Sequence, residues 1–209
     1  MAGFASLDRT VRRAEQAVPA LPEETRLDAR AADLDRFLAS VERRAFRIAR
    51  IALRSTDDAH DVVQVAMLRL AQHYAGKPGE QWAPLFYRIL HNAIRDLQRR
   101  QAVRRRFLGW LPGSPRPDDE TAEVDPLEQV ADPQPEPGER LSQAEAMSRL
   151  ELALRDLPPR QFQAFTLRCL EGLDVAATAS AMGCSTGSVK THYFRALQNL
   201  RARLDEVYP

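Results

Sequence analysis

Apolar residues recur at steps of three and four through much of the first half of the chain. The most regular run begins just after Asp33 and continues to Ala52. Steps of this size place the apolar side chains on one face of an α-helix. We therefore predict one long amphipathic helix that ends near Arg54. Its apolar positions are Leu34, Phe37, Leu38, Val41, Ala45, Ile48, Ala49 and Ala52.

Two more helices with the same period are predicted downstream. The first follows Ser55, a candidate cap residue, and ends before the turn that starts at Gly76. The second runs from about Gln81 to Arg105. Three helices of this kind can bury their apolar faces against one another, so we predict a first domain over 33–106.

Two stretches lack this regularity. Residues 1–32 are rich in alanine and charged side chains and are broken by Pro19 and Pro22. We expect a weakly structured extension there, with a short helix around 7–18. Residues 107–139 are rich in Pro, Asp and Glu and have no period, which predicts a flexible acidic linker.

Helical spacing resumes at Leu141 and continues to Leu170, with a restart after Pro158 and Pro159. We predict a second domain over 140–209. The fold class is therefore all-α, with two small helical domains joined by the acidic flexible linker.

The stretch 174–195 has the pattern of a helix-turn-helix. Ala179 is small enough to let two helices cross closely, and Gly183 can adopt the left-handed backbone of the turn. Val189 lies where the second helix needs an inward apolar side chain, and Ser185 can cap that helix. The second helix of such a motif lies in the major groove of DNA.

Charge supports a nucleic-acid partner even though the net charge is only +1. Residues 82–106 hold seven arginines and one acid, whereas 107–139 hold nine acids and one arginine. Residues 184–204 contain one lysine, three arginines and no acid. A phosphate backbone responds to local charge, so these two basic helical stretches are candidate DNA-binding surfaces.

Composition argues against several other classes. Cys169 and Cys184 make no metal-binding spacing or disulfide framework, and we expect reduced thiols. No apolar run approaches the ~20 residues of a membrane span, and the N-terminus lacks the apolar core of a signal peptide. We therefore expect a cytoplasmic protein with no membrane insertion, no metal and no cofactor. The four histidines are scattered and no carboxylates converge, so we expect no enzyme activity.

Two polar helix faces are candidates for function. Asp58, Asp61 and Gln64 share one face of the predicted second helix, although such a face is most often only solvated surface. The third helix mixes aromatic, amide and arginine side chains, which suit the exposed bases and phosphates of single-stranded nucleic acid. Alternatively, its aromatic residues complete the core and its arginines are only solvated. The mixed positions are Trp82, Tyr87, Arg88, His91, Asn92, Arg95, Asp96, Arg99 and Arg100.

Three blocks together resemble the bacterial extracytoplasmic-function (ECF) sigma factors, which are initiation subunits of RNA polymerase. Residues 58–64 (DAHDVVQ) are similar to the polymerase-binding segment of that family. Residues 86–92 (FYRILHN), followed by an aspartate and two arginines, are similar to its promoter-melting and minus-ten segment. Residues 157–200, which begin LPPRQ, are similar to its minus-thirty-five domain. The blocks occur in the family's order and are separated by a linker, as in the family.

The resemblance implies roles for these residues. Asp58, Asp61 and Gln64 would bind the clamp helices of the largest polymerase subunit, and the loop 76–81 would help receive a base flipped out of the duplex. Minus-ten DNA would be bound by Trp82, Tyr87, Arg88, Asn92, Arg95, Asp96, Arg99 and Arg100. Minus-thirty-five DNA would be bound by Ser188, Lys190, Thr191, His192 and Arg195. Core RNA polymerase and promoter DNA are the implied partners, and the family also allows an anti-sigma factor.

The chain departs from the family pattern at Leu85, where tryptophan is usual, and in the segment 187–192, which reads GSVKTH where GTVKSR is usual. His192 therefore makes the promoter preference uncertain. The main alternative is a stand-alone regulator with a LuxR-like helix-turn-helix, but 33–106 show no effector or receiver pattern. A third reading, an enzyme acting on nucleic acid, would need a metal or acid–base cluster.

Overall fold

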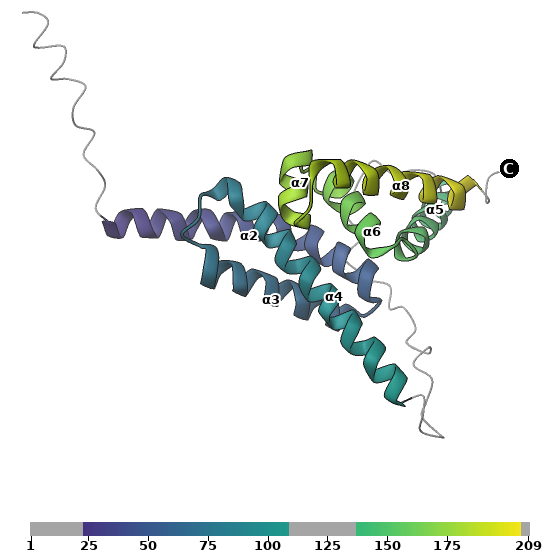
Figure 1. The fold of residues 1–209 in the computed structure, drawn as a ribbon, viewed down its shortest axis with the longest axis horizontal. Coiled ribbons are helices and arrows are strands. Elements are labelled where there is room, and N and C mark those ends of the chain that lie inside the picture. The colour runs from purple at the N-terminus through teal and green to yellow at the C-terminus, as the bar shows by residue number, and fades with distance from the viewer. Residues whose placement is uncertain (1–22, 109–136, 206–209) are drawn as a thin grey trace, which may run out of the picture.

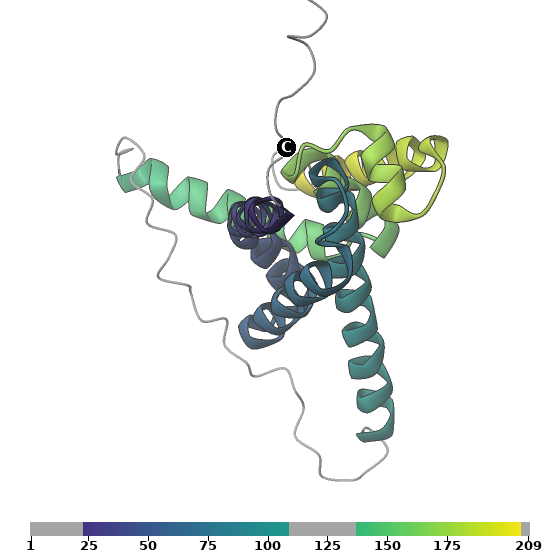
Figure 2. The ribbon, with the colours of Figure 1, turned by 90° about the vertical axis from the view of Figure 1, so that its left-hand side faces the viewer.

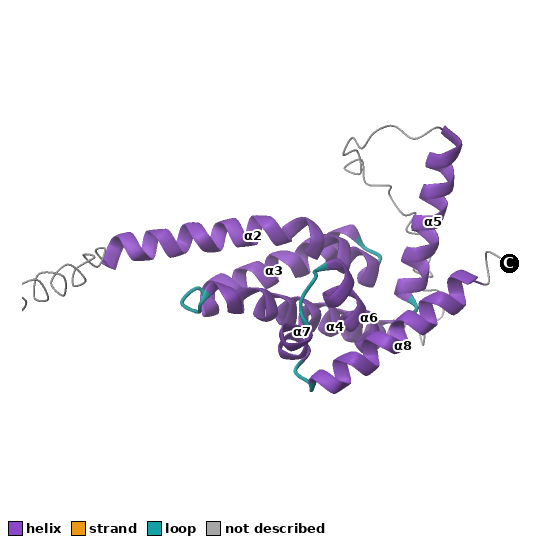
Figure 3. Cartoon of the chain, turned by 90° about the horizontal axis from the view of Figure 1, so that it is seen from above, coloured by secondary structure: helices purple, strands orange, loops and turns teal. Residues whose placement is uncertain are grey.

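The structure is a computed structural model that describes residues 23–108 and 137–205. All the regular elements within these two ranges are helices (Figures 1 and 3). The short helix expected around 7–18, and the part of the predicted linker over 109–136, lie outside the described residues.

The first domain consists of three helices. They are α2 (Glu23–Leu53), α3 (Thr56–Tyr74) and α4 (Trp82–Leu108), and a 3₁₀ turn, η1 (Gly79–Gln81), leads into α4. Ser55 caps α3, because its side-chain oxygen accepts a hydrogen bond from the backbone N–H of Asp58 at 3.1 Å.

Two predicted boundaries are wrong. Helix α2 begins at Glu23, so the last ten residues of the supposed weakly structured extension are helical. Charged and alanine-rich sequence without a breaker continues the helix beyond its buried face. At the other end, α4 continues to Leu108 and the next helix starts at Pro137, which shortens the predicted linker at both ends.

The core of the first domain contains the apolar faces predicted from the sequence. Ala45, Ile48 and Ala49 of α2 are fully buried, as are Leu70 of α3 and Phe86 of α4. The side chains at Ala45, Ile48 and Ala49 let α3 and α4 approach α2 closely. Phe86 meets Phe37 edge-to-face at 6.1 Å between ring centroids, which ties α4 to α2.

The second domain is also helical. It contains α5 (Pro137–Arg155), α6 (Pro159–Phe165), a π-helical turn η3 (Thr166–Leu170), α7 (Val175–Met182) and α8 (Thr186–Asp205). Buried side chains from α5, α6, α7 and α8 form its core, with Leu167 from η3.

The helix-turn-helix geometry confirms the prediction made for each key residue. Gly183 has φ +61° and ends α7 in the left-handed conformation. Ser185 accepts a hydrogen bond from the backbone N–H of Ser188 at 3.1 Å and so caps α8. Ala179 and Val189 are buried between the two helices, with Val189 only 1% exposed.

The two domains pack against each other. Figures 1 and 2 show α7 against α4, and α8 on the side of the second domain that faces away from the first. Arg50 of α2 donates to Glu151 of α5 at 3.0 Å. Arg44 pairs with Glu171 at 3.2 Å, and the hydroxyl of Tyr87 also donates to that carboxylate. Polar contacts between the domains therefore join α2 and α4 of the first domain to α5 and Glu171 of the second domain.

Candidate nucleic-acid interface

The polar face of α4 divides into two parts. Arg88, Asn92 and Arg95 are exposed but lie at the edge of a cleft between the two domains. Arg95 donates to the amide oxygen of Asn92 at 2.5 Å, and Arg88 donates to the backbone carbonyl of Ser180 in α7. These three predicted minus-ten residues therefore face the second domain.

The second part of the α4 face extends past the cleft. Asp96, Arg99 and Arg100 are exposed to solvent. Arg99 lies 3.7 Å from Asp96, and both side chains are more than half exposed, so the pair contributes little stability. The guanidinium groups of Arg99 and Arg100 are accessible to an external phosphate without any change in the fold.

The expectation that Trp82 stacks on DNA is corrected by the structure. Trp82 is only 6% exposed, its indole N–H donates to the Tyr74 carbonyl at 3.2 Å, and its ring packs on Phe37 at 5.8 Å. The ring faces are thus used in the core. One edge reaches a small cavity of about 470 Å³ at the predicted base-receiving loop, lined by Arg30, Asp33, Lys77, Pro78, Gly79 and Trp82.

Tyr87 is also buried, but for a different reason. It is 1% exposed, and its hydroxyl donates to the carboxylate of Glu171 from the second domain. Burial, followed by the neighbouring carboxylate, raises the pKa of Tyr87 far above its usual value. The pKa of Glu171 is also raised by burial, although Tyr87 and Arg44 both lower it. In this packing of the two domains the Tyr87 side chain is not accessible to an external ligand.

His91 is a buried residue that the sequence analysis did not assign. It is 8% exposed, its ring meets Phe162 of α6 at 6.2 Å, and its Nε2 atom has no hydrogen-bond partner. Burial, with a smaller effect of the Arg95 charge, lowers the pKa of His91 to about 3. The imidazole is therefore neutral at physiological pH. Only its place among the arginines could have marked it in the sequence.

The predicted polymerase-binding face lies on the outer side of α3. Asp61 and Gln64 are exposed, whereas Asp58 is half-buried and accepts a hydrogen bond from Gln101 of α4 at 2.8 Å. The sequence analysis missed two apolar neighbours on this face, Val65 and Leu68, which are 38% and 57% exposed. Val65 and Leu68 are apolar residues at positions that do not belong to the buried face of α3. Their apolar side chains at polar positions were the signal in the sequence.

The predicted minus-thirty-five residues all lie on α8. Lys190, Thr191 and Arg195 are exposed, and His192 is half-buried. Ser188 contributes its N–H to the helix cap, and the Thr191 hydroxyl donates to the Gly187 carbonyl of its own helix at 3.1 Å. Phe194, which is 61% exposed, was missed. This face of α8 is exposed to solvent in the present packing of the two domains.

A metal site and a membrane-spanning helix are both absent from the described ranges. Within 23–108 and 137–205, no three His, Cys, Asp or Glu side chains come together as a metal site. None of the helices in those ranges is long and apolar enough to cross a membrane.

Comparison with known proteins matches both halves of the chain. The family "Sigma-70 region 2" matches residues 37–104, and "Sigma-70, region 4" matches residues 147–200. SigM of Mycobacterium tuberculosis, an ECF RNA polymerase sigma factor, is 30% identical over 164 residues, which is 78% of this chain and 70% of that protein. SigD of the same species is 28% identical over 147 residues, which is 70% of this chain and 62% of SigD. The match thus spans less than two thirds of SigD.

Solved structures show the same fold. The sigma factor RpoE of Bartonella quintana, in complex with the anti-sigma factor NepR, matches with a TM-score of 0.57 and 21% identity, over 83% of this chain and 97% of that one. CnrH, in complex with the cytosolic domain of CnrY, matches with a TM-score of 0.51 and 20% identity, over 83% and 88%.

The two matched regions occur in this order on an all-helical fold, and both are regions of the sigma-70 family. The chain belongs to the ECF sigma factors of the sigma-70 family. The match over residues 37–104 accounts for the first half of the chain, so the alternative of a stand-alone LuxR-like regulator has no support.

Proposed function

We propose that this chain binds core RNA polymerase, directs it to specific promoters and promotes melting of the DNA there. The observation that carries the proposal is the order of the two sigma regions, each with an exposed basic helix face. Arg99 and Arg100 lie on the face in the first region, and Lys190 and Arg195 lie on the face in the second.

We assign polymerase binding to the outer face of α3. Asp61 and Gln64 supply polar groups, and Val65 and Leu68 supply apolar area that is otherwise exposed to water. An apolar centre with a polar surround is typical of protein interfaces. Asp58 remains part of the proposed site, although its bond to Gln101 also fixes α4 against α3.

We assign minus-ten DNA to the polar face of α4. Flipping a base out of the stack costs a few kcal/mol. Contacts of arginine with phosphates and stacking of about 1–3 kcal/mol per base can offset much of that cost, so no nucleotide hydrolysis is needed. Trp82 then forms one wall of the base-receiving cavity rather than a stacking platform. The proposed contacts remain Tyr87, Arg88, Asn92, Arg95, Asp96, Arg99 and Arg100.

We assign minus-thirty-five DNA to α8. Lys190 and Arg195 are exposed for phosphate contacts, and Thr191 and His192 lie between them on the same helix. Ser188 is placed at the start of the helix, where its N–H already serves the cap. His192 offers weaker phosphate and guanine contacts than an arginine would.

We call the present packing of the two domains the closed arrangement. In it, some of the proposed minus-ten contacts on α4 are not accessible to DNA. Tyr87 is buried and Arg88 is bonded to α7, so these residues reach DNA only after the second domain moves away. We infer that opening accompanies binding to the polymerase. An anti-sigma factor is a further proposed partner, since the similar sigma factor RpoE is solved in complex with the anti-sigma factor NepR. The proposed partners place the chain in the cytoplasm.

The test is a reconstituted transcription reaction. Purified chain is added to bacterial core RNA polymerase that lacks its own sigma subunit, with fragmented genomic DNA of the source bacterium as template. We expect discrete run-off transcripts that depend on the chain. A chain that binds promoter duplex tightly by itself but neither associates with core polymerase nor yields transcripts would overturn the proposal.

A further inference from the structure

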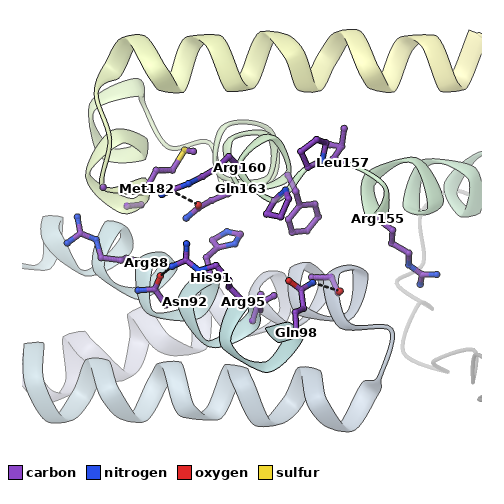
Figure 4. Close-up of a pocket in the computed structure, with 17 residues that line it drawn as sticks. Arg88, His91, Asn92, Arg95, Gln98, Arg155, Leu157, Arg160, Gln163 and Met182 are labelled. Carbon is purple, nitrogen blue, oxygen red and sulfur yellow. Dashed lines mark hydrogen bonds between the residues drawn. The ribbon is translucent and has the colours of Figure 1, made fainter. Parts of the chain in front are cut away.

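A cleft of about 770 Å³ lies between the two domains. Its walls come from α4 on one side and from the end of α5, α6 and the α7 turn on the other (Figure 4). The charged side chains that line the cleft are all arginines, namely Arg88, Arg95, Arg155 and Arg160, and no Asp or Glu is among the lining residues. Arg155 also lies 4.0 Å from Glu151, so the positive field of the cleft comes mainly from Arg88, Arg95 and Arg160.

Two buried polar nitrogen atoms in this cleft lack hydrogen-bond partners. His91 Nε2 and Arg155 Nε are both shielded from solvent and make no hydrogen bond. His91 is more than nine-tenths buried, and its ring lies within the cleft, whereas Arg155 lies at the cleft's end (Figure 4). An unpartnered buried polar group is costly, and in native structures it usually marks an absent ion, water or ligand.

One wall of the cleft is apolar. Leu157, Pro158 and Phe162 line it, opposite Ile94 of α4. Arg160 is fixed on the same side by bonds to the Met182 carbonyl at 2.7 Å and to Gln163 at 3.4 Å. A ligand that fits this lining carries negative charge at one end and an apolar or aromatic group at the other.

We propose that this cleft is a binding site for a small organic phosphate. Guanidinium groups bind phosphate through paired, directional hydrogen bonds, and a neutral imidazole can add one more donor. The ring system of the ligand lies against Phe162 and Leu157. The volume is that of a site for a small molecule and is too small for a DNA duplex.

Such a ligand would be held by both domains at once, so it stabilises the closed arrangement. Arg88 and Arg95 would contact the ligand instead of DNA. This competition between ligand and DNA rests on the proposed function, because it treats Arg88 and Arg95 as minus-ten contacts. The binding site itself does not depend on their role as minus-ten contacts. A phosphorylated metabolite would then lower the amount of chain able to bind a promoter.

The test measures the binding of three probes to the full chain by isothermal titration calorimetry in magnesium-free buffer. The probes are ADP, inorganic pyrophosphate and adenosine. We expect ADP to bind most tightly, pyrophosphate more weakly and adenosine not measurably. Replacing one charged donor, in Arg95→Gln, should weaken ADP binding by about tenfold. His91→Phe fills the same space without a donor and should weaken ADP binding several-fold.

Arg104→Gln is the matched control, because it removes the same charge from an exposed position on the same helix outside the cleft. Its ADP affinity should stay within twofold of the wild type. The proposal is wrong if neither phosphate probe binds the wild-type chain, or if Arg104→Gln weakens ADP binding as much as Arg95→Gln does. Core polymerase binding, measured separately, reports on the proposed function, so the two can fail independently.

Discussion

Glu171 of the second domain contacts two different helices of the first domain. Its side chain is 1% exposed, accepts a hydrogen bond from Tyr87 of α4 and forms an ion pair with Arg44 of α2 at 3.2 Å. Both partners belong to the first domain. The substitution Glu171→Ala removes both bonds and leaves the Tyr87 hydroxyl buried without an acceptor, so we predict that the two domains separate.

The size of the effect follows from the exposure of each partner. A hydrogen bond from a buried hydroxyl to a carboxylate contributes about 1.5–3 kcal/mol. The Arg44 side chain is 54% exposed, so its ion pair adds only about 0.2–1 kcal/mol. Part of this lost stabilisation is recovered, because the substitution also removes a carboxylate that is unfavourable to bury. Burial raises the pKa of Glu171, and its other oxygen has no hydrogen-bond partner. The net loss is about 2 kcal/mol, or a roughly 30-fold lower ratio of closed to open chain.

Spin-label distance measurements report this ratio directly. Nitroxide labels are placed at Arg69→Cys on α3 and Gln198→Cys on α8, both exposed, with Cys169→Ser and Cys184→Ser removing the native thiols. The wild-type pair should give one narrow distance population. Glu171→Ala should give a broad, longer one.

Asp156→Ala is the matched control, because Asp156 pairs with Arg203 inside the second domain and does not touch the first. It removes the same charge and one ion pair but should leave the distance distribution unchanged. The reasoning about Glu171 is refuted if Glu171→Ala keeps the narrow population, or if Asp156→Ala broadens it to the same extent.

The other predictions concern single surfaces. Arg99→Ala with Arg100→Ala should abolish permanganate-reactive open complexes while core binding stays intact; loss of core binding instead would contradict the assignment of α4. Leu68→Glu should weaken core binding by at least about tenfold in native gels, since it places a charge in the apolar centre of the proposed interface; unchanged affinity would exclude that face. Lys190→Ala should weaken minus-thirty-five binding by the holoenzyme and reduce its salt slope by about one, whatever the sequence; an unchanged slope would argue against phosphate contact. Since the pKa of His91 is lowered to about 3 in the closed state, lowering the pH from 7.5 to 5.5 should destabilise that state by about tenfold relative to His91→Phe; equal pH profiles of the two proteins would refute this.

The sign of the His91 effect can be stated explicitly. A histidine whose pKa is lowered stabilises the closed state fully above its usual pKa near 6.5, and this stabilisation is lost as the pH falls below that value. The raised pKa of Glu171 acts in the opposite direction, favouring closure as the pH falls. Glu171 is present in both proteins, so the comparison with His91→Phe isolates the histidine.

Local features were predictable from the sequence because they depend on neighbouring residues. The left-handed turn at Gly183, the cap at Ser185 and the buried Val189 follow from spacing and side-chain type within 174–195. The start of α2 could have been found too, since a proline directly followed by Glu23 and a second glutamate is a typical helix start.

Contacts between distant residues could not be predicted in the same way. Tyr87 and Glu171 are separated by 84 positions, and neither lies in a periodic apolar pattern that would place them together. Trp82 packs on Phe37 of another helix, and its own surroundings in the sequence fit a DNA-stacking residue equally well. The burial of His91 likewise depends on Phe162, in the other domain. The packing of the two domains is therefore what the structure adds.

We propose that this chain is a promoter-specificity subunit whose first domain melts DNA. Permanganate footprinting at a promoter found by the run-off reaction tests it most directly. We expect reactive thymines in the minus-ten region only when both core polymerase and the chain are present. We expect none with the double variant that carries Arg99→Ala and Arg100→Ala. Reactive thymines with core polymerase alone, or undiminished reactivity with the double variant, would contradict it.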